Sequence, residues 1–355
     1  MTGITASFGY GGLSNQQTLN LASLSQIKDN LQEQASTGVK SSNYAQLGET
    51  RAQALALQPA ITQVSSWSSN VTMAQNRLTV TQSTVSQIAT IADNLNDTLS
   101  TLVGNVSSTA ISSASEQAKS YLSSLGNLLN TQEGGSYIFS GLQSSTAPVS
   151  TSLSSSSLAS SIQETVKSMG NGSASDVLSE TLSLAKDTSQ NQPFSAALST
   201  DPVTAAQQKL KITVGTNQTV SAGIVATEGS TSSETSTGSP IRDLMRNLMV
   251  VASLSSDDAG TTDYTQLVQG LQTTNTGVTE GLSDISGSLG IQQNSLTSQS
   301  TMLAQMKAAL TTQLGTAKDA DLAQVSVQLN DTSNQLQASY SIIANMKGMT
   351  LASYL

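Results

Sequence analysis

Residue types that commonly carry catalysis or hold metals are scarce in this sequence. Its 355 residues include no His and no Cys, which excludes Cys/His zinc sites and His-dependent nucleophiles. Asp319 and Asp321 could form an acid/base pair, but their place before a helical pattern is far more typical of a helix cap. For an enzyme that uses Ser and Lys, no Ser-x-x-Lys motif lies in a glycine-framed context. We therefore expect no catalytic residue, no cofactor and no metal.

The charge balance argues against nucleic acid and membranes as partners. Lys and Arg number 14 against 23 Asp and Glu, for a formal net charge of −9. Phosphate backbones and anionic lipid surfaces are bound mainly through Lys and Arg, which are the minority here. The longest apolar run, 248–254, is far short of the ~20 residues that cross a bilayer. We expect no nucleic-acid binding and no membrane insertion.

The composition also indicates how the chain packs. Only 10% of the residues are charged and 3% are aromatic. A chain so poor in large aromatic side chains builds thin cores, which favours long helical pairs over a globule. We expect a mainly α protein with a long antiparallel coiled-coil helical stalk formed by both termini. A small β-containing variable outer domain would be inserted in the middle.

The strongest helical signal is an unbroken heptad register from residue 57 to 102. Its a positions are Leu57, Val64, Val71, Leu78, Val85, Ala92 and Leu99. Its d positions are Ala60, Trp67, Ala74, Thr81, Ile88, Leu95 and Leu102. A seam with two apolar residues per heptad predicts packing against another helix along its length. Pro59 is expected to begin or kink this helix, because it lacks a backbone donor.

A second heptad register runs along residues 282–313. Its a positions are Leu282, Leu289, Leu296, Leu303 and Leu310, and its d positions are Ile285, Gln292, Gln299, Met306 and Gln313. Polar residues in a seam predict that this helix shares its burial with several neighbours. We expect Gly315 to interrupt the pattern, and Asp319 or Asp321 to cap a last helix.

Both chain ends carry apolar stripes that predict terminal assembly helices paired with each other. The first, about 15–34, has Leu21, Leu24, Ile27 and Leu31. The last has Leu322, Val325, Leu329, Leu336, Ile343 and Met346, followed by Leu351 and Leu355. Chain ends usually fray into solvent, so ordered apolar ends predict a partner.

Between the helical ends the sequence changes character after GGSYIFSG, residues 134–141. A helix is predicted at about 114–129 before it, and a Ser-rich segment at 142–200 after it that is either weakly packed or a surface insertion. A β-hairpin is predicted at 210–224, a flexible stretch at 228–239, and a helix behind Pro240. The predicted division is 1–40, 41–141, 142–239, 240–314 and 315–355.

The order of these parts resembles bacterial flagellins: a terminal helix, the turn QASTGVKSS at 34–42, a long coiled-coil helix, a variable region and returning helices. Tyr137, Phe139 and Gly141 match the Gly-x-Tyr-x-Phe-x-Gly signature of hook-filament junction proteins within that family. The hairpin, the helix IRDLMRNL and the tail TLASYL are similar to those proteins too. The resemblance covers the chain apart from its Ser-rich middle.

The resemblance implies a structural role in the bacterial flagellum, outside the cell, and assembly in place of catalysis. It implies terminal helices that fold only on assembly, and export through the flagellar type III channel. The expected partners are copies of the chain, a hook-side junction protein, filament flagellin and an export chaperone. The first residues show neither a basic leader nor an apolar core, so no cleavable signal peptide is expected.

Three functions fit these observations to different degrees. The leading hypothesis is the junction protein that links hook and filament, and the alternative is the flagellin of the filament itself. A coiled-coil adhesin or phage fibre protein is a remote alternative, since it would need an anchor or signal segment that the sequence does not display.

Overall fold

The structure is a computed structural model that describes residues 8–104, 106–149, 152–168, 173–189, 193–256 and 261–348. For residues 8–14, 46 and 346–348 it describes the backbone alone. The described chain forms two compact units. We call the residues up to Ser65 and from Ala304 onward the terminal unit, and residues 66–303 the central unit.

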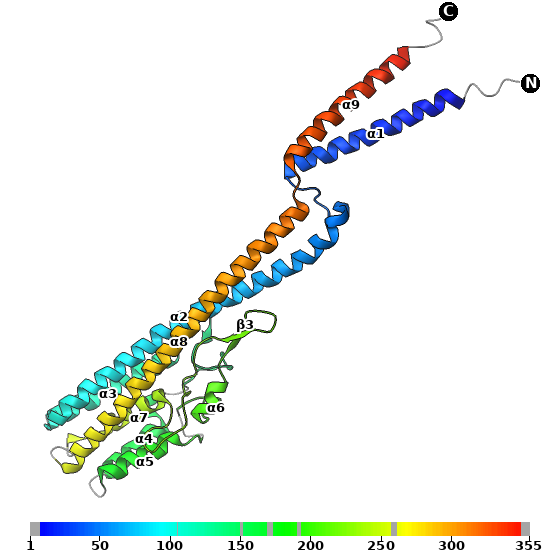
Figure 1. Ribbon diagram of the computed structural model, residues 1–355. Coiled ribbons are helices and arrows are strands. Elements are labelled where there is room, and N and C mark those ends of the chain that lie inside the picture. Colours follow the sequence, from blue (N-terminus) through cyan, green and yellow to red (C-terminus); the bar gives the residue numbers. More distant parts are fainter. Residues whose placement is uncertain are drawn as a thin grey trace, which may run out of the picture. The chain divides into compact units, whose positions relative to one another are not determined.

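Long helices dominate both units (Figure 1). They are α1 (Phe8–Thr37), α2 (Arg51–Gly104), α3 (Ser108–Leu129), α4 (Ser157–Lys167), α5 (Ala174–Lys186), α6 (Pro202–Gln207), α7 (Pro240–Ser253), α8 (Thr262–Lys318) and α9 (Leu322–Gly348). Short 3-10 helices lie at Tyr44–Gln46, Gly48–Thr50 and Leu153–Ser155. The strands form two small antiparallel pairs, β1 (Gln132–Glu133) with β2 (Ser136–Tyr137) and β3 (Lys211–Thr213) with β4 (Thr219–Ser221). The expected mainly α fold with a few short strands is confirmed.

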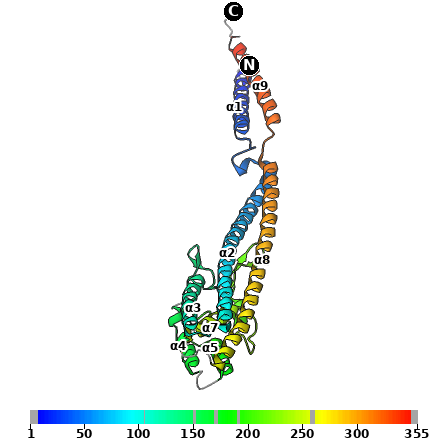
Figure 2. The ribbon, with the colours of Figure 1, turned by 90° about the vertical axis from the view of Figure 1, so that its left-hand side faces the viewer.

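In the central unit α2 and α8 lie side by side and run antiparallel, as Figures 1 and 2 show. Gln82 of α2 donates to Ser286 of α8, and further along α2 Ser100 accepts from Gln272 at 3.0 Å. Because the residue number rises on one helix as it falls on the other, the pairing is antiparallel. Two distant parts of the sequence, 66–102 and 272–303, therefore form one pair of helices.

The α2 helix begins before its predicted start. We expected Pro59 to begin or kink it, yet α2 starts at Arg51 and Pro59 lies inside it, so the predicted start is wrong. Proline removes one helical bond, the one to the residue four positions earlier. That residue is Leu55, whose side chain is 46% exposed, so its carbonyl is on a face where water can replace the missing donor.

Two further helix boundaries differ from prediction. The first helix spans Phe8–Thr37, longer than the predicted 15–34. Gly315 does not end the preceding helix, since α8 continues to Lys318. Glycine costs a helix interior only about 1 kcal/mol, which the packing of so long a helix overrides. Asp321 caps α9 as predicted, since its Oδ1 accepts from the backbone of Ala323 and Gln324 at 3.0 and 3.2 Å.

The Ser-rich segment is well packed, so the first of the two expected alternatives, a weakly packed segment, is wrong. It contains the amphipathic helices α4 and α5, whose apolar faces are buried at Leu158, Ile162, Val166, Val177 and Leu182. The serines favour these helices because they cap them. Ser156 Oγ accepts from the backbone of α4, and Ser173 forms a capping box with Asp176.

The predicted hairpin at 210–224 is confirmed, with strands shorter than the sequence pattern. Lys211 pairs with Ser221 and Thr213 pairs with Thr219. The stretch 228–239, expected to be flexible, is instead a closed loop in which Ser230 N donates to Gly238 O at 2.9 Å. A side chain at Gly229 would collide with the carbonyl of Gly238, so glycine is required for this closure.

Helix α7 lies at the centre of the packing in the central unit. It contacts α3, α4 and α5, and every residue from Ile241 to Val251 is buried. Pro240 begins it at the first turn, as predicted. The sequence IRDLMRNLMVV thus places two arginines, one aspartate and one asparagine inside the protein.

Candidate assembly interface

The terminal unit is built on the antiparallel pair of α1 and α9, which lie side by side in Figures 1 and 2. The predicted pairing of the two chain ends is therefore confirmed. The α1–α9 pair buries few apolar side chains: Leu31 of α1 is 6% exposed, and Val325 and Leu336 of α9 are 4% and 6% exposed. Leu21, Leu24, Leu329 and Ile343 are half-buried. The pair therefore has a narrow contact stripe for its length.

Both terminal helices also carry apolar side chains that the single subunit leaves in water. These are Leu19 (66% exposed), Val327 (61%), Tyr340 (56%), Ile342 (52%), Leu322 (50%) and Ile27 (45%). Ile27 and Leu322 were predicted to share the apolar stripes, but in the single subunit they are exposed, because no neighbouring helix covers their sides. The side chain of Met346, together with Leu351 and Leu355, lies outside the described residues.

The apolar residues of α9 lie on two opposite faces. Each residue turns an α-helix by about 100°. Val325 and Leu336 therefore lie close to one direction, toward α1. Val327 lies nearly opposite them, and Ile342 lies about 60° from Val327 and more than 90° from Val325 and Leu336. A helix that is apolar on both sides needs two neighbours, and α1 supplies one of them.

The turn after α1 is joined to the end of α8 by backbone bonds. Lys40 N donates to Lys318 O at 2.7 Å, and Ala320 N donates to Gly38 O at 2.9 Å. Lys40 Nζ also lies 3.2 Å from the carbonyl oxygen of Thr316, in the last turn of α8, where a cation is favoured. This predicted Ser/Thr-Gly turn thus fixes the start of α9.

Below the turn, a small apolar cluster anchors the start of α2. Leu47, Ala54 and Ala317 are buried together, with Tyr44 and Leu314 packed against them. Thr50 Oγ1 donates to Ala317 O at 2.9 Å, and Lys318 Nζ lies 5.0 Å from the centre of the Tyr44 ring. The residues where α8 ends and α9 begins are therefore held by packing as well as by backbone bonds.

Most of the predicted coiled-coil residues of the central unit are inaccessible to solvent. None of the following is more than 1% exposed: Val71, Leu78, Val85, Ile88, Leu95, Leu99, Leu102, Leu282, Leu289, Leu296 and Leu303. Trp67 of the central unit is half-buried. In the terminal unit Val64 is 2% exposed, and Leu57 and Leu310 are half-buried. The buried seam of the central unit is thus continuous between residues 71 and 102.

The predicted neighbours of the polar seam positions are present. Gln299 Nε2 donates to Val214 O at 3.0 Å, and Gln292 Oε1 accepts from Gly223 N at 3.4 Å. Val214 lies in the turn of the β3–β4 hairpin, and Gly223 follows its second strand. Asn70 of α2 donates to Thr213 O of the same hairpin at 2.9 Å. The Gln side chains therefore bind the hairpin to the helix pair, which explains their place in the seam.

The Tyr137–Gly141 segment is held against α2 by a buried arginine. Arg77, which is 4% exposed, donates through an NH2 group to Tyr137 O at 2.8 Å and Ile138 O at 3.0 Å. Burial lowers the pKa of Arg77, although Glu133 nearby counteracts the shift. Phe139 is fully buried and Tyr137 half-buried. The motif is therefore part of the core of the central unit.

Sequence reasoning missed the buried charges of α7. Arg242 donates to Leu198 O and Thr200 O at 2.8 and 2.7 Å, and its guanidinium lies 5.6 Å from the centre of the Phe194 ring. Burial lowers its pKa to about 10. Charges at this spacing normally indicate a solvent-exposed face, so the amphipathic pattern does not predict that these residues are buried. Ile241, Leu244 and Leu248 lie on an apolar stripe of ordinary width, so the sequence carries no signal that the polar side of the helix is buried as well.

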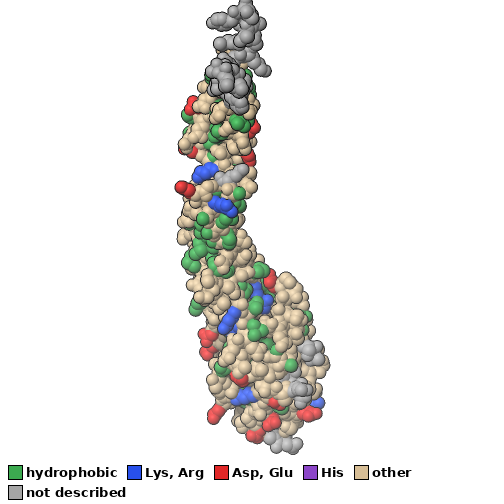
Figure 3. Space-filling model, turned by 90° about the vertical axis from the view of Figure 1, so that its right-hand side faces the viewer, with side chains coloured by type: hydrophobic (Ala, Val, Ile, Leu, Met, Phe, Trp, Pro, Cys, Tyr) green, Lys and Arg blue, Asp and Glu red, His purple; other side chains and the backbone are tan. Residues whose placement is uncertain are grey.

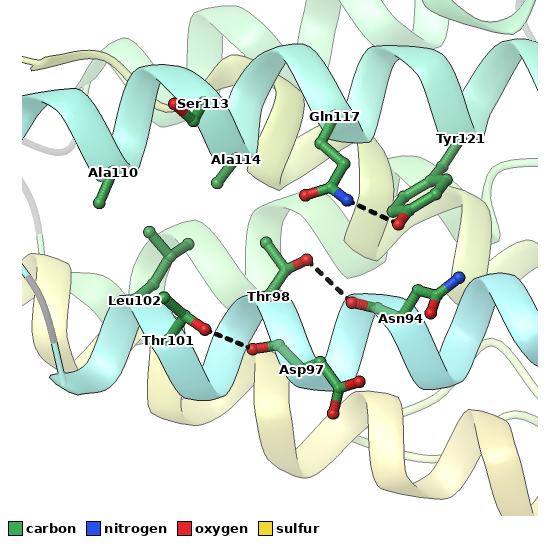
Figure 4. A pocket seen from close by; sticks show the side chains of 10 residues that line it. All are labelled: Asn94, Asp97, Thr98, Thr101, Leu102, Ala110, Ser113, Ala114, Gln117 and Tyr121. Atoms are coloured by element: carbon green, nitrogen blue, oxygen red, sulfur yellow. Dashed lines mark hydrogen bonds between the residues drawn. The ribbon is translucent and has the colours of Figure 1, made fainter.

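One groove of the central unit runs between α2 and α3, and the side chains that line it form no catalytic arrangement (Figure 4). It measures about 400 Å³ and is lined chiefly by small and amide side chains, with Asp97 as its one carboxylate. Gln117 Nε2 donates to the Tyr121 hydroxyl at 2.7 Å across one wall. Within the described residues, no three His, Cys, Asp or Glu side chains gather to hold a metal.

Charged side chains are sparse on the face of the molecule that Figure 3 shows, where apolar and uncharged polar atoms prevail. Among the described helices, none is both long and apolar enough to span a membrane.

Two family models match the chain. The bacterial flagellin N-terminal helical region matches residues 12–144, and the bacterial flagellin C-terminal helical region matches residues 271–355. Together they take in well over half of the sequence, including α2, α3, α9 and most of α8. The first match ends three residues after Gly141, close to the predicted change of character in the sequence. No curated protein matches the chain.

Proposed function

Since the chain belongs to the bacterial flagellin family, a family of structural flagellar subunits, we propose that it is the junction protein that links the hook to the filament. Its terminal helices bind axial neighbours on both sides, which would be a hook-side junction protein and the first filament flagellins. The filament flagellin itself is the second candidate.

The role of a subunit in an assembly is supported by the two apolar faces of α9. Val327 and Ile342 are 61% and 52% exposed on the side away from α1. Ordering a backbone residue costs ~1–2 kcal/mol, so a helix pair with so narrow a contact stripe gains stability when neighbours cover the exposed side. Copies of the same surface that do not close on themselves form a helical array.

The junction role in particular is supported by the Tyr137–Gly141 segment, and this is the observation on which the proposal rests. The spacing of this segment follows the Gly-x-Tyr-x-Phe-x-Gly signature of junction proteins. Arg77 binds the segment through the carbonyl of Tyr137, and the segment packs so closely at Gly141 that a side chain there would collide with the Gln208 carbonyl. The β3–β4 hairpin followed by α7 agrees with the same resemblance. Export through the flagellar type III channel and binding of an export chaperone before assembly belong to this proposal.

Copy number tests the proposal against the filament alternative. Filaments sheared from cells should contain this chain only in traces, found with the hook end, and another flagellin in bulk. Deleting its gene should leave complete hooks without filaments and release unpolymerised flagellin into the medium. If the chain is instead the main protein of sheared filaments, it is the filament flagellin and the junction role is wrong.

A further inference from the structure

Asn275 is a buried polar residue in the seam between α2 and α8. It is 0% exposed. It lies seven residues before Leu282, so it continues the a column of Leu282, Leu289, Leu296 and Leu303 by one heptad. The seam positions that flank it, Leu271 and Val278, are apolar and no more than 1% exposed. An asparagine at such a position costs stability unless its amide is bonded.

The amide of Asn275 joins three helices. Its Nδ2 group donates to Ala92 O and to Asn96 Oδ1 of α2, both at 2.8 Å. Its Oδ1 accepts from Asn247 Nδ2 of α7 at 3.5 Å. Asn247 is also fully buried, and its Oδ1 accepts from Thr274 Oγ1 at 3.3 Å. Asn275 is therefore satisfied only where these particular residues of α2 and α7 face it.

Other polar contacts along the seam specify the alignment less strictly. Thr81 is fully buried, but its hydroxyl donates to Arg77 O of its own helix at 2.8 Å, so it is satisfied in any alignment. The bond of Gln272 to Ser100 is exposed, and water can replace either partner. The bond of Gln82 to Ser286 is only part-buried, so water can replace it as well. The bonds of Asn275 come from a side chain that is 0% exposed, so a displaced helix cannot replace them with water.

The apolar positions of the two helices do not by themselves exclude a shift. Both columns repeat every seven residues, so moving α8 by one heptad, about 10 Å, brings apolar residues opposite apolar residues again. After such a shift the place of Asn96 opposite Asn275 is taken by Ala89 or Val103. Neither side chain can accept a hydrogen bond, and the amide is left buried with a donor unpaired.

We propose that Asn275, through Asn96, Ala92 and Asn247, fixes the register of α8 against α2. The apolar seam supplies the attraction between the helices, and the asparagine selects one alignment out of the set that the heptads allow. This role does not depend on where in the flagellum the subunit is placed. It matters for any subunit of an array, because a displacement of about 10 Å moves every contact surface on the helix.

Disulfide trapping in the full-length chain tests this, since the chain has no cysteine of its own. Gln82→Cys with Ser286→Cys reports the observed register. Gln82→Cys with Thr279→Cys, or with Gln293→Cys, reports a shift by one heptad in either direction. Each pair is made with Asn275 present and with Asn275→Leu. With Asn275 present, only the first pair should cross-link. With Asn275→Leu, one of the shifted pairs should cross-link at least tenfold more.

Two further variants make the outcome decisive. Asn294→Leu changes an exposed asparagine of the same helix and should cross-link as the parent does. Asn275→Ala removes the amide with a smaller side chain, which the seam tolerates at Ala74 and Ala92, and serves if the leucine variant does not fold. If every folded Asn275 variant cross-links only through the Gln82→Cys and Ser286→Cys pair, the register is set elsewhere and the proposal is wrong.

Discussion

At the scale of single residues, Gly141 has two separate reasons to be glycine. Its φ is +62°, and a Cβ there would lie 2.5 Å from Gln208 O. The left-handed conformation costs another residue ~1–2 kcal/mol, and the collision adds to that. We expect Gly141→Ala to lower the free energy of unfolding by about 3 kcal/mol, measured by urea denaturation of the purified chain.

Gly135 provides the matched control, because its φ is +79° but nothing lies within 4 Å of the added Cβ. Gly135→Ala should show only the conformational cost of ~1–2 kcal/mol. Equal losses for the two variants would contradict the assigned collision with the Gln208 carbonyl.

Glu228 is a buried carboxylate whose ionisation works against folding. Its Oε1 lies 2.8 Å from Lys209 Nζ, and its Oε2 accepts from Val225 N at 2.7 Å. Burial nevertheless raises the pKa of Glu228 above its ordinary 4.5, against the smaller lowering effect of Lys209. The stability contributed by this raised pKa is fully present below the unfolded pKa and is lost as pH rises through the folded pKa.

Glu228→Gln, which imitates the protonated form, should therefore gain stability relative to the parent between about pH 4 and pH 7. Urea denaturation of both proteins across this range measures the difference, and the comparison cancels the titration of other groups. A relative loss for the variant as pH rises would show that Lys209 outweighs desolvation. Asp176→Asn is the control. The exposed carboxylate of Asp176 has a pKa lowered by its bonds to Ser173, so this variant should lose stability relative to the parent as the pH rises.

At the scale of elements, α7 carries two buried arginines with unequal partners. Arg242 donates two short bonds to the carbonyls of Leu198 and Thr200. One turn later, Arg246 is 1% exposed and donates to Thr274 Oγ1 at 3.4 Å. The buried Nε has no partner among the described residues in either arginine, so the two differ in the bonds of their terminal NH2 groups. Burial lowers the pKa of Arg246, so its charge is held at a cost in free energy.

We expect the two substitutions to act in opposite directions. Arg242→Met leaves two carbonyls without their donor and should destabilise the chain by about 1–3 kcal/mol. Arg246→Met removes a poorly bonded buried cation and should leave stability equal or raise it by about 1 kcal/mol. Urea midpoints of the two purified variants give the order, and a larger loss for Arg246→Met would refute this reading of the helix.

The two long helices show what was predictable from sequence and what was not. Heptads identify α2 and α8 because their burial follows one narrow stripe, as at Leu78 and Leu289. The full burial of α7 could not be predicted in this way, because its charged residues lie together opposite its apolar stripe, a pattern that normally indicates a solvent-exposed side. Pro59 and Gly315 were misread as boundaries, since local propensities of about 1–3 kcal/mol are small beside the packing of a helix of more than 50 residues.

The far face of α9 gives an element-scale test of assembly. Val327→Ser with Ile342→Ser removes the exposed apolar side chains and leaves Val325 and Leu336, which pack toward α1. Far-UV circular dichroism of the free subunit should be unchanged, whereas incorporation into flagella should fall at least tenfold. Gln328→Ser with Gln337→Ser is the control, with two exposed polar residues of the same helix changed. Unimpaired incorporation of the apolar-to-serine variant would exclude this face from the interface.

At the scale of the whole molecule, the two chain ends depend on one another. Residues about 280 positions apart in the sequence meet where Lys40 N donates to Lys318 O and Ala320 N donates to Gly38 O. The pairing of the ends was predictable from their apolar stripes. The side chains that stay exposed could not be predicted, because their exposure depends on which helices lie beside them, as Ile27 and Leu322 illustrate.

The last prediction concerns the C-terminal end as a whole. Deleting residues 340–355 removes Tyr340 and Ile342, which are 56% and 52% exposed, together with half-buried Ile343. It leaves the central unit, residues 66–303, intact. We expect the truncated chain to remain soluble with the unfolding transition of the central unit retained. Incorporation into flagella and swimming of the cells should be lost, as measured by immunoblots of sheared flagella and by motility in soft agar.

Two outcomes would separate a folding defect from an assembly defect. A truncated chain that is degraded or insoluble would mean that the C-terminal segment stabilises the subunit itself, contrary to the division into two compact units. A truncated chain that is exported, folded and absent from flagella agrees with a helix whose second apolar face is completed only by neighbours. Normal swimming with the truncated chain in place would contradict assembly through α9, because the remaining part of α9 exposes only Leu322 and Val327 among its large apolar side chains.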